Sequence, residues 1–235
     1  MGSQMGYTGR IGNVVHYKMG DKFYSRSLPK KYKQTKRTKA KSAEFGMAST
    51  IAKLIRNNLG AVIFNPADRK MQTRLVGEIY SWLQLARRLP ASRTTQPTLD
   101  RFRFSKSPSL SSRWRTYYKV SIPTGGQLQI AIPSFIPKQD FIAPANATGV
   151  VCKIASVVID VENKVELGAA KNEISYTLDQ NKVLAQNIIQ ELPMPRGSLL
   201  VTGMCLEYFV DRYKNIVQTE DKIFQPSQII YSVHH

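Results

Sequence analysis

The sequence predicts an α+β protein in which an N-terminal hairpin, a basic arm and a helical pair precede an antiparallel immunoglobulin-like β-sandwich. Three observations lead to this prediction. Apolar residues recur at helical spacing between residues 45 and 89, strand patterns follow one another from residue 118 onward, and the basic residues gather in the first half. We expect two domains, with the basic region and its linker in 1–112 and the sandwich in 113–235.

The charge of the chain is divided unevenly. The 235 residues carry a net charge of +18, while 42% are hydrophobic and 21% are charged, which is ordinary for a folded protein. Residues 1–119 hold 25 basic and five acidic side chains, whereas residues 120–235 hold nine basic and eleven acidic ones. Because like charges repel, such a split favours a polyanionic partner close to the first half.

The first predicted element is a β-hairpin. Val14–Lys18 and Lys22–Arg26 are rich in strand-forming residues and flank the short loop Met19-Gly20-Asp21. We expect Lys18, Lys22 and Arg26 near one edge of this hairpin. Because an isolated two-stranded hairpin is only marginally stable, it should dock on another surface.

A basic arm follows the hairpin over residues 30–41. This segment contains no acidic residue, so its charges repel one another and we expect it to stay extended until a partner neutralises it. Its one aromatic residue, Tyr32, could stack on a base. The basic residues of the arm are Lys30, Lys31, Lys33, Lys36, Arg37, Lys39 and Lys41.

Two helices come next. In the first, apolar residues recur from Phe45 to Leu59 at spacings of three and four. The second begins with Asn65 as N-cap and Pro66 at the first helical position, and its apolar face runs from Met71 to Ala86. The short connection predicts an antiparallel pair. Early turns of the second helix project Arg69, Lys70 and Arg74.

Residues 90–112 are rich in Ser, Thr and Pro and indicate a linker or long loop with a short strand at Arg101–Phe104. Seven strands are then predicted within about 116 residues, which fits a small antiparallel sandwich. The chain is short for a viral jelly roll, so we favour an immunoglobulin-like arrangement. The predicted strands are 118–122, 127–132, 149–160, 173–178, 185–192, 198–210 and 229–233.

The two cysteines, Cys152 and Cys205, both fall in predicted strands of the β domain. Their separation is compatible with a disulfide of the immunoglobulin type between two sheets. No Trp lies between them, however, and nothing in the sequence indicates an oxidising compartment. We therefore expect two buried free thiols.

The N-terminal sequence contains the run from Gly9 to Val15 and then Arg26-Ser27-Leu28-Pro29, which stands before a Lys-rich segment and a helix. In these residues it resembles an uncharacterised protein family that is common in Bacteroidota. The resemblance covers about the first quarter of the chain. It implies the layout of hairpin, helices and C-terminal β domain and a bacterial or bacteriophage source. It supplies no catalytic residues.

The residue inventory argues against an enzyme. Only three histidines are present, and two of them, His234 and His235, end the chain. The cysteines lack the CxxC spacing of zinc sites, and no P-loop motif occurs. We expect no catalytic residue, no metal ligand and no cofactor. Without an N-terminal apolar segment or a membrane span, we expect a cytoplasmic protein, or a virion protein if the source is a bacteriophage.

The sequence thus favours a non-enzymatic structural protein that binds nucleic acid or another polyanion through its basic N-terminal half. The alternative is a structural assembly subunit of a bacteriophage virion or injection apparatus, whose partners would be copies of itself or other assembly proteins. The predicted nucleic-acid-binding residues are Lys30, Lys31, Tyr32, Lys33, Lys36, Arg37, Lys39, Lys41, Arg69, Lys70 and Arg74.

Overall fold

The computed structural model describes residues 7–29, 33–63, 70–88, 98–100, 102–105, 108–123, 126–212 and 215–235. The chain divides into two compact units, residues 1–41 and residues 42–235, and helix α1 (Lys36–Asn58) runs across this division. The boundary expected from the sequence, at residue 112, falls inside the second unit. The expected start of the second helix at Asn65 lies outside the described residues.

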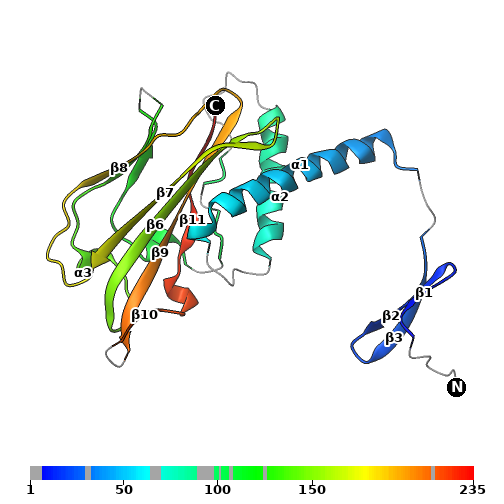
Figure 1. Ribbon diagram of the computed structural model, residues 1–235, viewed down its shortest axis with the longest axis horizontal. Helices are drawn as coiled ribbons and strands as arrows, with labels where there is room; N and C mark the ends of the chain where they lie inside the picture. Colours follow the sequence, from blue (N-terminus) through cyan, green and yellow to red (C-terminus); the bar gives the residue numbers. More distant parts are fainter. Residues whose placement is uncertain are drawn as a thin grey trace. The chain divides into compact units, whose positions relative to one another are not determined.

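The first unit contains a three-stranded antiparallel sheet in the order β1-β2-β3 (Figure 1). Its strands are β1 (Gly9–Ile11), β2 (Val14–Met19) and β3 (Lys22–Ser27). The predicted hairpin is confirmed as β2 and β3, while β1 was not anticipated. Gly12 and Gly20 occupy the two turns with φ of 56° and 64°, a conformation that glycine adopts without steric cost.

The second unit contains two antiparallel sheets. The larger has the order β10-β9-β6-β7, with β11 also pairing with β9, and the smaller has the order β4-β5-β8. The antiparallel C-terminal sheets are confirmed, whereas this strand order does not by itself establish the immunoglobulin-like arrangement. The strands are β4 (Lys119–Ser121), β5 (Leu128–Ile132), β6 (Ala147–Asp160), β7 (Val165–Thr177), β8 (Gln186–Gln190), β9 (Ser198–Arg212), β10 (Asn215–Gln218) and β11 (Ser227–His234).

Strands β6 and β9 form the centre of the larger sheet and are covered on both faces. Side chains alternate between the faces of a strand, so Cys152 and Ile154 of β6 and Met204 of β9 point toward the smaller sheet. On the opposite face, Val157 and Val201 contact the helices. Figure 1 shows the resulting layers of the second unit, with the smaller sheet, the larger sheet and the helices side by side.

Helices α1 and α2 (Met71–Arg88) cover the larger sheet. They cross, as Figure 1 shows, with Phe45 packed on Tyr80 and Gln84 donating a hydrogen bond to Glu44 over 2.7 Å. The antiparallel helical pair expected from the sequence is therefore wrong. Each helix uses its apolar face against the sheet, which leaves the pair with only a local contact at the crossing.

Part of the predicted linker belongs to the core. Leu99, Phe102 and Phe104 are buried in the same apolar cluster as the helices, and Arg103 forms an isolated antiparallel bridge with Gln228 of β11. These three apolar residues were not predicted to be in the core because the surrounding sequence is rich in Ser and Pro. The remaining short helices of the described residues are η1 (Gly60–Val62), η2 (Leu110–Ser112), α3 (Pro137–Asp140) and η3 (Lys222–Phe224).

No helix in the part of the chain that the structure describes combines the length and the apolar character that a membrane span requires.

The segment that follows α1, Leu59 and η1, packs closely against Gly203 of β9. A methyl group at this position would lie 2.9 Å from Cδ2 of Leu59 and 3.0 Å from Cγ2 of Val62. Both neighbours are fully buried, and the branched Val62 side chain has few alternative rotamers. The absence of a side chain at residue 203 therefore sets how closely the helical layer approaches the sheet.

We predict that Gly203→Ala lowers the free energy of unfolding by about 1–3 kcal/mol, because the added methyl overpacks this contact. Gly46→Ala is the matched control, since Gly46 lies on the exposed side of α1 with no atom within 4 Å of the added methyl. The free energy of unfolding of this control should rise by up to about 1 kcal/mol, because Ala has a higher helix propensity than Gly. Urea denaturation measures both. Equal stability of Gly203→Ala and the wild type would contradict the packing argument.

Candidate nucleic-acid interface

The basic segment is partly helical. Thr35 Oγ1 accepts a hydrogen bond from the backbone N–H of Thr38 over 3.1 Å and so caps the start of α1. The expectation of an extended arm is wrong from Lys36 onward, because Lys, Arg and Ala favour helix and the cap adds to that preference. Residues 36–43 are all exposed. These two helical turns, which we call the basic turns, carry Lys36, Arg37, Lys39 and Lys41.

The basic turns combine two electrostatic effects of the same sign. The N-terminus of a helix carries about half a positive charge, so cations in the first turn are unfavourable there and anions are favourable. The first turn of α1 contains no acidic residue. Residues 22–43 hold nine basic residues and no acidic one. A negative group placed beside the basic turns would therefore meet both the side-chain charges and the helix dipole.

The other predicted residues are placed differently. Lys33 is exposed just before the helix, while Lys30, Lys31, Tyr32 and Arg69 lie outside the described residues. Lys70 is exposed directly before α2.

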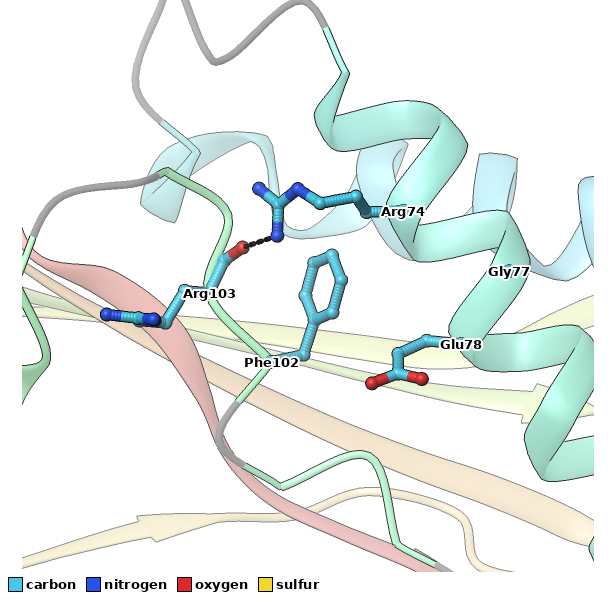
Figure 2. Close-up of a pocket in the computed structure, with 5 residues that line it drawn as sticks. All are labelled: Arg74, Gly77, Glu78, Phe102 and Arg103. Atoms are coloured by element: carbon cyan, nitrogen blue, oxygen red, sulfur yellow. Dashed lines mark hydrogen bonds between the residues drawn. The ribbon is translucent and has the colours of Figure 1, made fainter.

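Arg74 is engaged within the second unit. Its Nη1 donates a hydrogen bond to the carbonyl oxygen of Arg103 over 3.0 Å, and its guanidinium lies 5.3 Å from the centroid of the Phe102 ring. Figure 2 shows these groups around a pocket of about 400 Å³, which Gly77 and Glu78 also line. The Arg74 side chain thus ties α2 to the segment 102–105, which pairs with the start of β11. The carboxylate of Glu78 offsets positive charge at this pocket.

A second candidate surface lies on the N-terminal sheet. Register and alternation place Tyr17, Tyr24 and Arg26 on one face, and the Tyr17 and Tyr24 rings stack with centroids 5.8 Å apart. The Arg26 guanidinium lies 5.8 Å from the Tyr17 centroid. We call this surface the tyrosine face; it consists of Arg10, Val15, Tyr17, Met19, Lys22, Tyr24 and Arg26.

This face was not predicted from the sequence. Lys18, Lys22 and Arg26 were expected near one edge, but Lys18 lies on the central strand β2 opposite Phe23, and its side chain is on the other face of the sheet. The signal that finds the face is the spacing of two between Lys22, Tyr24 and Arg26, which puts the three side chains on one side of a strand. Arg10 could not be assigned because β1 was not anticipated.

The histidines make local structural contacts. His16 Nδ1 and Ser25 Oγ lie 2.6 Å apart because these residues are direct partners on β2 and β3. The His234 ring packs edge-on against Trp82, and burial lowers the pKa of His234. No group of three or more His, Cys, Asp or Glu residues with the spacing of a metal site occurs among the residues described.

Comparison with protein-family models, curated proteins and solved structures finds no match to this chain. The resemblance to the Bacteroidota family therefore stays a prediction.

The two cysteines are free and buried, as the sequence predicts. Cys152 pairs with Leu206 and Cys205 pairs with Lys153, so neighbouring strands point the two thiols to opposite faces of the larger sheet. A disulfide between them would require the backbone to move. Burial raises the pKa of Cys152 from 9.0 to about 12 and raises that of Cys205 well above its ordinary value.

We predict that neither thiol reacts with Ellman's reagent in the folded protein and that both react after unfolding in urea. Burial disfavours the thiolate, so the folded state is stabilised relative to the unfolded state by keeping Cys152 protonated. This contribution to the free energy of unfolding is complete below the ordinary thiol pKa of 9.0 and is lost as the pH rises toward about 12. Urea midpoints measured from neutral to alkaline pH should fall across that window. Rapid labelling of the native protein, or a native disulfide, would contradict this placement.

Proposed function

We propose that this chain is a non-enzymatic structural protein that binds nucleic acid or another polyanion through its basic N-terminal part. The observation that carries the proposal is the exposure of the basic turns within an uninterrupted run, residues 22–43, that contains no acidic side chain. Residues 1–41 hold eleven basic residues and one acidic residue, Asp21. More than half of the net charge of the chain is thus concentrated in about a sixth of its length.

Phosphate groups suit this arrangement physically. Lysine and arginine side chains that neutralise phosphates release condensed counterions, which supplies affinity without sequence preference. The helix N-terminus adds a favourable dipole interaction with the same groups. An exposed helical segment also holds its cations at fixed spacing, so less conformational freedom is lost on binding than in an extended arm.

A second candidate function is a structural assembly subunit. Among described residues of the first unit, 7–29 and 33–41, none is buried, and Ile11 and Met19 are 59% and 63% exposed. A three-stranded sheet without a core of its own gains stability from a partner that covers it. This candidate predicts a salt-resistant oligomer, which sedimentation velocity at low and high salt detects.

The immunoglobulin-like arrangement of the C-terminal sheets belongs to the same proposal. It is supported by two antiparallel sheets that share an apolar cluster between them. Such a unit would serve as a rigid carrier for the basic part.

We predict that replacing Lys36, Arg37 and Lys39 with Gln weakens binding to nucleic acid and flattens its salt dependence. Each lost phosphate contact lowers the slope of log affinity against log salt by about 0.7 to 0.9, so three contacts lower it by about 2 to 3. The free energy of unfolding should change by less than about 0.5 kcal/mol per substitution, since these side chains are exposed. Fluorescence anisotropy over a salt series measures the slope.

The matched control removes the same charge from the second unit by replacing three exposed lysines with Gln: Lys138, Lys171 and Lys182. This variant should keep the wild-type slope. If both variants lose affinity equally, binding depends on net charge alone and the proposed interface is wrong. If the first variant keeps its slope but loses self-association, the assembly function is favoured.

A further inference from the structure

We propose that the tyrosine face stacks the unpaired bases of a single-stranded nucleic acid. This inference rests on the proposed function and specifies the kind of polyanion that it binds. Tyr17 and Tyr24 are 37% and 38% exposed, although both rings contact each other across the strands. Their ring planes are 23° apart, so the rings are nearly parallel and offset, and each keeps part of its surface open.

Three of the other aromatic residues that stand near positive charge in the sequence are buried. Tyr117, near Arg115 and Lys119, is 83% exposed, but among the described residues it has no aromatic partner on a neighbouring strand of the kind that Tyr17 has in Tyr24. Phe102, Phe104 and Trp114 are buried in the second unit, and Trp114 packs on Phe141 with ring centroids 5.2 Å apart. These rings are part of the apolar core. The two tyrosines of the N-terminal sheet thus differ from them, because exposed aromatic surface beside cations is the combination that binds single strands.

The charges of the tyrosine face select an anionic occupant. Arg10, Lys22 and Arg26 are exposed on it, and it contains no acidic residue. The guanidinium of Arg26 beside Tyr17 could contact a phosphate while a base covers the ring. A second copy of the same face would bring three cations against three cations, so charge disfavours self-pairing through this surface.

The exposed rings also distinguish a single strand from a duplex. Base faces are stacked on one another inside a duplex, so a protein aromatic ring reaches them only at unpaired nucleotides. Cross-strand stacking of the two tyrosines stabilises the hairpin in any case. That role accounts for their mutual contact but not for the three cations on a face that carries no acidic side chain.

The first test compares the affinity of the full chain for an oligothymidylate of about 20 nucleotides and for a duplex of the same length. The double variant Tyr17→Leu with Tyr24→Leu should bind the single strand at least about tenfold more weakly than the wild type. Its affinity for the duplex and its salt slope should be unchanged, because no charge is removed. Tyr17→Phe with Tyr24→Phe should restore single-strand binding, since the rings remain.

The matched control is Tyr7→Leu. Tyr7 is also exposed in the first unit, but its ring packs on His16, whose register places it on the opposite face of the sheet. This variant should bind the oligothymidylate like the wild type. Equal losses in the control and the double variant would overturn the assignment of the bases to the tyrosine face.

A second test uses the unaltered protein and does not depend on how the variants fold. An oligonucleotide with 5-iodouracil in place of thymine is irradiated in the complex, and the crosslinked residue is identified by mass spectrometry. Crosslinks to Tyr17 or Tyr24 support the proposal, and crosslinks found only elsewhere overturn it.

The two levels of the proposal fail in different ways. If the wild type binds neither nucleic acid at low salt, the proposed function and this inference fail together. If it binds both equally through the basic turns, and the leucine variant is indistinguishable from the wild type, only the stacking inference fails. If the wild type binds an acidic peptide through the tyrosine face but does not bind the oligonucleotide, the face is a protein-binding surface and the stacking inference also fails.

Discussion

The structure of the second unit depends on the burial of β6 and β9 on both faces. A strand in this position needs apolar residues at consecutive positions, because each alternate side chain meets a different layer. Its polar residues must then satisfy one another, as Ser156 and Thr202 do through a 3.0 Å hydrogen bond between directly paired positions. Lys153 and Glu207 likewise form an ion pair with a 2.7 Å separation. The central strands therefore fix where the helices and the smaller sheet can pack.

Elements with a strong local pattern could be predicted from the sequence, and those defined by distant contacts could not. The hairpin, the central part of each helix and most strands can be predicted from the periodicity of the apolar residues. Strand β10 escaped prediction because its four residues carry too little pattern. The crossing of α1 and α2 depends on the sheet beneath them, which no property of the helical residues encodes. Phe102 and Phe104 escaped because the polar composition around them was typical of a linker.

The candidate interface divides in the same way. The concentration of positive charge is a property of the sequence, and its location was evident without a structure. Whether a given cation is accessible depends on tertiary contacts. Arg74 illustrates this, because its guanidinium contacts the carbonyl oxygen of Arg103 and the ring of Phe102, which are distant in the sequence. The helical start at Lys36 was missed because repulsion among the lysines was weighted above helix propensity and the Thr35 cap.

The two units differ in how they reach stability, and this difference bears on function. The second unit buries its apolar residues within itself and includes its last strand in the larger sheet. The first unit has no buried residue among those described, yet it keeps exposed tyrosines and a run of cations. Fixing such charges and rings in helix and sheet costs conformational entropy and adds self-repulsion, and no described residue of this unit is buried to offset these costs. An anionic, base-bearing ligand would supply both missing contributions, since phosphates relieve the repulsion and bases cover the rings.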